Sequence, residues 1–329
     1  MKEILPGIYQ ITLPLPGFSP DSMNVYLFRH NQEYLIIDTG CDTPALVDFI
    51  KELLVDFNIR FSDIKQVLIT HCHVDHLGMI GRYKKENNAK IYLHQNETGL
   101  IKIRFSHGDN YWPMTEQFLQ GQGMPATELT PTQFQLPGVT SLPAPDVLFQ
   151  GGEEIPAGQY KLRVINTPGH TPGHVAYYEP EKKLLFCGDV LLPTIVTNAA
   201  LHVQHITNPI QQYLHSLEIL KKLDVELVLP GHEYIFSGHR QRIDEIVQHI
   251  RNKNQEIIRS FTDNVPRTAY AISRLLSWSP NTKVTTWFKL SDWDKRFAVL
   301  QTTAHLEELV YAKKLARFSQ NDIIYYQKP

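Results

Sequence analysis

The 329-residue chain is long enough for one large domain with a smaller one beside it, and its content of 42% hydrophobic and 20% charged residues is ordinary for a globular protein. The formal net charge of −2 excludes a global electrostatic attraction to nucleic acid or to an anionic membrane. Three cysteines without framework spacing exclude a disulfide scaffold, and no uncharged apolar run reaches the roughly 18 residues of a membrane span. Because the N-terminus also lacks a signal-peptide pattern, we expect a soluble cytoplasmic protein with no membrane partner.

Short strands and helices alternate in the N-terminal part of the chain. Apolar runs bounded by Pro, Gly and Asp predict strands at 7–13, 24–28, 34–37, 67–70 and 90–94. Apolar residues at helical spacing predict a helix over 44–57, where Pro44 suits the first turn, and a second helix near 79–87. This alternation indicates a layered α/β protein.

Residues 95–150 interrupt this rhythm with glycines, prolines and scattered aromatic side chains, among them Phe105, Trp112 and Phe134. A long stretch without periodicity inside a domain is usually functional or disordered, and aromatic side chains argue against disorder. We interpret 95–150 as a lid or substrate-binding insertion, with a decorative subdomain as the alternative. A strand-and-turn pattern then resumes from Gln159 and runs to Pro230, with strands at 161–165, 183–186 and 225–229.

The chain becomes helical over 241–261, which predicts a boundary between a domain at 1–238 and a smaller one at 239–329. The second region carries 15 Lys and Arg against 9 Asp and Glu, so the two parts differ in charge. It continues with a second helical segment and ends in the β-type run "DIIYYQKP". Helices followed by a short strand pair are typical of a small winged-helix module. Its basic residues are interspersed with acidic ones, which favours a tail that packs on the first domain over one that grips nucleic acid.

The run "HCHVDH" at 71–76 follows directly after a predicted buried strand. Residues two apart on an extended segment face the same side, so His71 and His73 are placed to hold one ion. Asp75 and His76 follow as the chain turns into a helix, and imidazole with carboxylate suits zinc, iron or manganese. The alternative is a polar turn in which Asp75 caps the helix.

Three later strands end in similar residues, in the motifs "NTPGHTPGH", "CGDV" and "PGHEY". Neighbouring strands of layered α/β proteins end at one edge, so His170, Asp189 and His232 are placed to meet the first cluster. Each residue alone has an ordinary explanation, as a turn hydrogen bond, a loop cap or a surface histidine. Four such motifs together favour a metal site.

This series of motifs resembles the signature of the metallo-β-lactamase-fold hydrolases over residues 1–238. The resemblance implies a four-layer αββα sandwich of two mixed sheets. It implies one metal ion held by His71, His73 and His170, and a second held by Asp75, His76 and His232. Asp189 would bridge the two ions, and Asp38 in "IIDTG" would support the ligands.

Two features indicate which branches of this family the chain resembles. An Asp at 189 is similar to the glyoxalase-like and phosphodiesterase branches, whereas true β-lactamases place a Cys ligand there. We expect Cys187 to be a core residue and His174 to be structural. The C-terminal region resembles the winged-helix tail of a subgroup that includes the lactamase-β-like endoribonuclease of animals.

The resemblance implies an enzyme with two divalent ions, zinc above iron or manganese, and a metal-bridging hydroxide that Asp75 orients or whose proton Asp75 shuttles. The leading hypothesis is hydrolysis of a small ester, thioester or lactone. The alternatives are a phosphodiesterase with RNA as its partner, a single-iron persulfide dioxygenase, and a non-enzymatic regulator with a relic metal site. Asn198, His202 and His205 are candidates for the substrate mouth or form an ordinary polar loop. The sequence does not indicate an oligomeric state.

Overall fold

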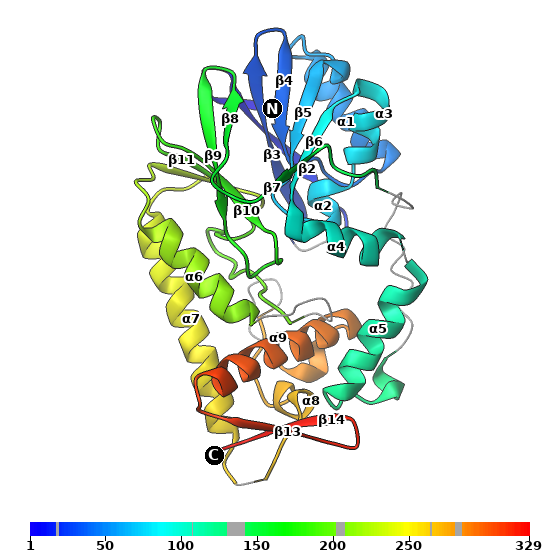
Figure 1. Cartoon of the computed structure of the whole chain (residues 1–329), viewed down its shortest axis with the longest axis vertical. Helices are drawn as coiled ribbons and strands as arrows, with labels where there is room; N and C mark the ends of the chain where they lie inside the picture. The colour runs from blue at the N-terminus through cyan, green and yellow to red at the C-terminus, as the bar shows by residue number, and fades with distance from the viewer. Residues whose placement is uncertain (18–19, 107, 130–141, 202–207, 264, 280–284) are drawn as a thin grey trace.

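Seven strands form the first sheet, in which spatial order follows chain order. They are β1 (Lys2–Leu5), β2 (Ile8–Pro14), β3 (Ser22–His30), β4 (Glu33–Ile37), β5 (Ile64–Leu68), β6 (Lys90–His94) and β7 (Val147–Phe149). The strands pair antiparallel from β1 to β4 and parallel from β4 to β7. This structure is a computed structural model that describes residues 1–17, 20–106, 108–129, 142–201, 208–263, 265–279 and 285–329 (Figure 1).

The helices α1 (Pro44–Val55) and α3 (Ile80–Asn87) connect the parallel strands β4, β5 and β6. Thr43 caps α1 by accepting a hydrogen bond from the Leu46 amide at 3.3 Å, and Pro44 occupies the first turn as predicted. Parallel neighbours need such crossovers, which cover one face of the sheet with helices. The short helix α2 (Val74–Leu77) lies between β5 and α3, and a 3₁₀ turn (Phe61–Asp63) precedes β5.

Five strands form the second sheet, in the spatial order β12-β11-β10-β9-β8. They are β8 (Glu154–Ala157), β9 (Tyr160–Asn166), β10 (Val175–Glu179), β11 (Leu184–Gly188) and β12 (Leu227–Pro230). Only β11 and β12 run parallel within this sheet. Both sheets are therefore mixed.

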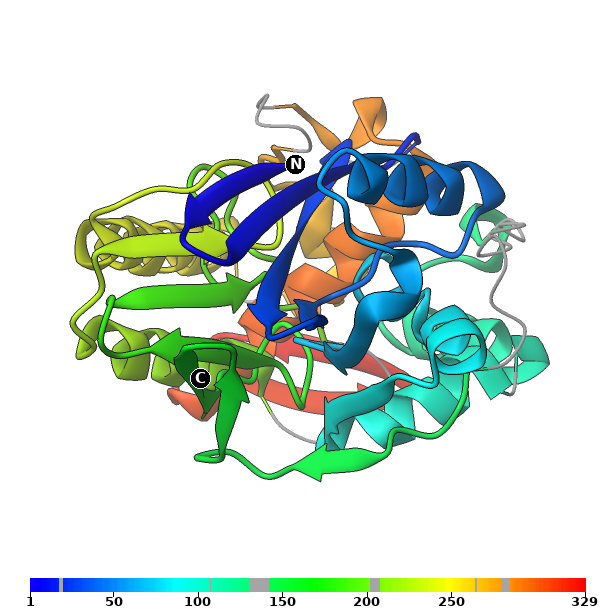
Figure 2. The same ribbon diagram turned by 90° about the horizontal axis from the view of Figure 1, so that it is seen from above.

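The two sheets pack face to face, and helices cover the outer face of each (Figures 1 and 2). Phe28 and Leu35 of the first sheet pack against Tyr177 and Phe186 of the second. The outer face of the first sheet packs on α1 and α3, and that of the second packs on α6 (Pro209–Lys221) and α7 (His239–Ser260). These are the four layers of the predicted αββα sandwich.

Helix α6 corrects the strand-and-turn pattern predicted for 159–230. Asn208 accepts a hydrogen bond from the Gln211 amide at 3.2 Å, and Pro209 starts the first turn. Ile210, Tyr213 and Leu217 are buried on one side of the helix against the second sheet. The parallel pair β11 and β12 requires a crossover, and α6 provides it.

The described part of the predicted insertion, residues 95–106, 108–129 and 142–150, is largely helical. It contains a 3₁₀ turn (Gln95–Glu97), α4 (Thr98–Ile101), a π-helical turn (Lys102–Ser106), α5 (Gly108–Gly121) and a second 3₁₀ turn (Ala126–Glu128), and its end forms β7. Phe134 lies outside the described residues. Leu119, Met124 and Leu129 share one hydrophobic core with the C-terminal region, and α5 lies beside that region in Figure 1.

The C-terminal region contains α7, α8 (Ala269–Ser273), a 3₁₀ turn (Trp287–Lys289), α9 (Asp292–Tyr311) and the antiparallel pair β13 (Ala316–Gln320) and β14 (Ile323–Gln327). The helices and the terminal strand pair agree with the sequence pattern, while a winged-helix architecture stays a prediction. None of the described helices is both long and apolar enough to cross a membrane.

Candidate metal centre

The residues predicted to bind metal follow the C-terminal ends of four strands. Residues 71–76 follow β5, His170 follows β9, Asp189 follows β11 and His232 follows β12. Asp38 directly follows β4. Their side chains form two adjoining groups, one of His71, His73, His170 and Asp189 and the other of Asp75, His76 and His232.

The nitrogen atoms of the first group lie close together. His73 Nδ1 is 2.9 Å from both His71 Nε2 and His170 Nε2, and these two Nε2 atoms are 3.2 Å apart. Zinc bonds of 2.0–2.1 Å in tetrahedral geometry place neighbouring ligand atoms about 3.3 Å apart. The spacing therefore fits a single small cation.

The outer nitrogen atoms of two of these rings identify their tautomers. His170 Nδ1 donates to the carbonyl oxygen of Asn198 at 2.8 Å. His71 Nδ1 donates to Thr70 Oγ1 at 3.0 Å, because the Thr70 hydroxyl proton is given to Asp38. Burial lowers the pKa of both histidines, so each is neutral and its Nε2 carries a lone pair. Two lone pairs 3.2 Å apart repel each other unless a cation lies between them.

The two histidines of the second group differ in protonation from those of the first group. The Nε2 atoms of His76 and His232 are 3.3 Å apart, and Asp75 Oδ2 lies 3.6 Å and 3.4 Å from them respectively. Burial opposes protonation, but the Asp189 and Asp75 carboxylates raise the pKa of His76 to about 9 and that of His232 well above its ordinary value. Without a metal these rings take up protons, which a divalent ion would displace.

Asp189 lies between the two groups. Its carboxylate oxygens are 3.5 Å from His170 Nε2, 3.4 Å from His76 Nε2 and 3.5 Å from His232 Nε2. Burial alone would raise the pKa of Asp189, but the surrounding histidines hold it well below its usual range. Its Oδ1 atom is buried without a hydrogen-bond partner, which suits an oxygen that ligates a cation.

Asp38 supports both groups from behind. Its carboxylate accepts hydrogen bonds from the Thr70 amide, the Thr70 hydroxyl and His76 Nδ1, each at 2.8 Å. The residue is buried and has a φ of +61°, a conformation that Asp tolerates better than most residues. Asp38 thereby orients His76 directly and His71 through Thr70.

Glycine at 231 leaves room for this arrangement. A Cβ atom there would lie 2.6 Å from Asp189 Oδ1 and 2.9 Å from His76 Cε1. Any side chain at this position would push the carboxylate or the ring out of the centre.

Three supporting residues were not found by sequence reasoning. Glu97 is fully buried and accepts hydrogen bonds at 2.6 Å from the Cys72 amide and the Gly173 amide, which joins the loop of His71 to the loop of His170. The Thr70 hydroxyl links Asp38 to His71 by hydrogen bonds to both side chains. Asn24 donates to the carbonyl oxygens of Pro230 and Glu233. Only Glu97 had a sequence signal, a lone acidic residue in the turn after a strand.

The predicted structural residues lie in supporting positions. His174 contacts Thr167 Oγ1 through Nδ1 at 2.8 Å and accepts the Asp189 amide at Nε2, so both its nitrogens are used. Cys187 is buried in the outer core of the second sheet. Of the candidates for the substrate mouth, Asn198 orients His170 through its backbone carbonyl, and His202 and His205 lie outside the described residues.

Comparisons with known proteins place similar chains in one family. A crystal structure of a metallo-beta-lactamase family protein from Thermus thermophilus covers 99% of this chain and 100% of its own, with a TM-score of 0.83 and 26% identity. The "Probable metallo-hydrolase YqjP" of Bacillus subtilis (strain 168) is 23% identical over 329 residues, or 97% of each chain. The human "Acyl-coenzyme A thioesterase MBLAC2" is 26% identical over 231 residues, which are 68% of this chain and 77% of that protein.

The family model of the metallo-beta-lactamase superfamily matches residues 19–232, which include every residue of both groups. These matches identify the chain as a metallohydrolase by its family. The chain belongs to the metallo-β-lactamase superfamily.

Proposed function

We propose that this protein is a binuclear zinc hydrolase that cleaves a small thioester, ester or lactone. The observation that carries the proposal is the position of Asp189, whose carboxylate lies within 3.5 Å of a histidine from each of the two groups. A single-ion site would not need a carboxylate that reaches both groups. The neighbouring donor atoms are imidazole nitrogens and carboxylate oxygens, a donor set that zinc accepts readily.

When bound, the ions would lower the pKa of a coordinated water and polarise the carbonyl group that is attacked. The protein's own contribution is orientation, because Asp38, Asn198 and the Ser22 carbonyl hold the outer nitrogen atoms of His76, His170 and His232. Asp75 is less buried than His76 and His232 beside it, and its side chain keeps 14% exposure. It is therefore placed to orient a water molecule and to hold a proton during the reaction.

Two features favour a thioester among the possible substrates. Asp189 resembles the glyoxalase-like branch of the family, so cleavage of a β-lactam is not the first expectation. A relative with 26% identity, MBLAC2, is named an acyl-coenzyme A thioesterase. A thioester is also more readily attacked than an ordinary ester, and its thiolate leaves without a general acid.

The first experiment measures metal content per chain by mass spectrometry in the full-length protein purified without added metal. The parent is compared with Asp189→Ala and with Asp48→Asn, a control on the exposed face of α1. We expect about two zinc ions per chain in the parent and in the control, and fewer in Asp189→Ala. One iron per chain, unchanged in Asp189→Ala, would contradict the binuclear zinc site.

The second experiment assays the metal-loaded protein on acetyl-coenzyme A, S-lactoylglutathione, a simple lactone and a single-stranded RNA. We expect cleavage of at least one thioester or lactone, and a loss of about a thousandfold or more in Asp189→Ala. Cleavage of RNA alone would replace the proposal with a phosphodiesterase. A metal-loaded protein that turns over none of these substrates would overturn it.

A further inference from the structure

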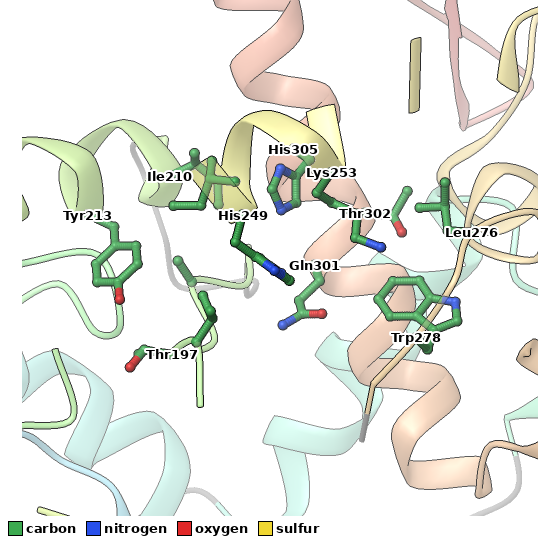
Figure 3. Close-up of a pocket in the computed structure, with 13 residues that line it drawn as sticks. Thr197, Ile210, Tyr213, His249, Lys253, Leu276, Trp278, Gln301, Thr302 and His305 are labelled. Carbon is green, nitrogen blue, oxygen red and sulfur yellow. The ribbon is translucent and has the colours of Figure 1, made fainter. Parts of the chain in front are cut away.

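A pocket lies where the segment 196–199 meets the helices α6, α7 and α9 (Figure 3). Its wall includes Val196, Thr197 and Ala199, and the residue between them, Asn198, orients His170 through its carbonyl oxygen. Thr197 also donates its hydroxyl proton to the backbone carbonyl of Asp189. The pocket and the metal centre therefore share one segment of backbone.

The pocket has an apolar part and a polar part. Ile210, Leu276 and Trp278 supply apolar surface at its sides, and Figure 3 shows the polar ends of Lys253 and Gln301 between them. Its enclosed volume is about 60 Å³, and its mouth opens to solvent. A narrow space of this composition suits the slender chain of a small organic molecule with one polar end.

Thr302 provides an unsatisfied polar group in the wall of this pocket. Its hydroxyl is buried without a hydrogen-bond partner, and the residue keeps only 1% exposure. A threonine inside a helix ordinarily donates to the carbonyl oxygen four residues before it, as Thr303 does to Val299 at 2.8 Å. The unused Thr302 hydroxyl indicates a ligand atom that would pair with it.

The wall carries one cationic side chain, Lys253, which is paired with Glu256 outside the wall. Lys253 is the only Lys or Arg among the described residues that line the pocket, and no Asp or Glu is among them. Two of its three ammonium protons go to Glu256 Oε2 at 2.8 Å and to the Ser277 carbonyl oxygen at 2.6 Å, which leaves one donor. Glu256 itself is held outside the wall, where its other oxygen accepts from the Ser277 amide at 2.7 Å.

We propose that this pocket binds a small monocarboxylate with an apolar body, with its carboxylate on Lys253 and Thr302 and its apolar part against Trp278. The site is separate from the metal centre, and the inference does not depend on the proposed reaction. A ligand there would contact the segment that positions His170 and Asp189. Binding of the ligand would therefore affect the metal centre.

The test is calorimetric titration of the full-length protein as purified, with sodium hexanoate as the probe and 1-hexanol as the uncharged probe of equal chain length. We expect saturable binding of hexanoate and binding of hexanol that is weaker by about tenfold or more. Lys253→Gln should weaken hexanoate binding by about tenfold, and Thr302→Val should weaken it by about fivefold. Lys289→Gln, an exposed lysine of the same region outside the pocket, should leave it unchanged.

Thermal melting shows whether Lys253→Gln is folded. If it is not, Thr302→Val still tests the proposal, because this substitution keeps the shape of the side chain. Equal binding of hexanoate and hexanol would overturn the carboxylate assignment. Hexanoate binding that survives in Thr302→Val and in a folded Lys253→Gln would place the acid elsewhere, such as on the metal ions, and would overturn the site. The absence of saturable binding would overturn it as well. Metal content is measured on the same samples. It tests the proposed hydrolase independently of whether hexanoate binds in the pocket.

Discussion

Asp38 and His76 lie 38 residues apart in the chain, yet the Asp38 carboxylate accepts a 2.8 Å hydrogen bond from His76 Nδ1. The contact joins the ends of the neighbouring parallel strands β4 and β5, because one residue follows β4 and the other lies just beyond β5. Its effect is to direct His76 Nε2 toward His232 and Asp189. The pairing of two strands thus sets the direction of the His76 side chain.

Replacement of Asp38 by Asn should weaken metal binding while preserving the fold. Asn tolerates the positive φ at this position, but it lacks the negative charge that holds the proton on His76 Nδ1. We expect the affinity for the more weakly held ion to fall by about tenfold to a hundredfold. Competition with a coloured chelator measures this change, with Asp48→Asn as the control. Equal affinities in the two variants would contradict a supporting role for Asp38.

Metal binding should release protons and strengthen as pH rises. The pKa of His76 is raised from 6.5 to about 9, so between these values the metal-free folded protein carries a proton that the unfolded chain has lost. A divalent ion must displace that proton, so its apparent affinity should rise with pH up to about 9. The stability that this proton gives the metal-free protein is complete below 6.5 and is lost as pH rises toward 9.

Calorimetry in two buffers that differ in ionisation enthalpy counts the released protons. We expect release at about pH 7.5 and a smaller release at about pH 10, where His76 is already neutral. A heat that is independent of buffer at the lower pH would contradict the protonated second group.

Replacement of Gly231 by Ala should damage the metal centre without a backbone penalty, because Gly231 does not have a positive φ. The added Cβ would meet Asp189 Oδ1 at 2.6 Å, so the carboxylate must move. We expect metal affinity to fall by about tenfold or more with little change in the circular dichroism spectrum. Gly99→Ala is the matched control, since no atom lies within 4 Å of its added Cβ. A Gly231→Ala protein that binds metal as tightly as this control would refute the steric argument.

Replacement of Glu97 by Gln should destabilise the protein. Glu97 accepts two backbone hydrogen bonds in a fully buried position, and the amide of Gln would oppose one N–H donor with another. We expect the free energy of unfolding to fall by about 2 kcal/mol, measured by urea denaturation. Glu181→Gln, at an exposed turn, should change it by less than about 0.5 kcal/mol. Equal stabilities in the two variants would show that Glu97 does not join the two loops.

The seven residues of the two groups were predictable because each follows a recognisable strand, and strand ends meet at one edge. Asp189 and His232 are 43 residues apart, but the parallel pairing of β11 and β12 brings them together. Glu97 had only its acidic side chain in the turn after a strand as a signal, and its role was missed because its partners are backbone amides, which any residue type supplies. Helix α6 was missed although Asn208 and Pro209 mark its start, since the strand pattern on both sides dominated the interpretation.

Leu119, Met124 and Leu129 pack in one core with C-terminal residues such as Ile257 and Leu300. During synthesis the ribosome makes the first three residues more than 120 positions before Ile257. Until the C-terminal region emerges, most of the side chains that bury these three residues are missing. We therefore expect the apolar surface of the insertion to stay exposed until the C-terminal region is made, and a chain that ends after His232 to leave this surface uncovered.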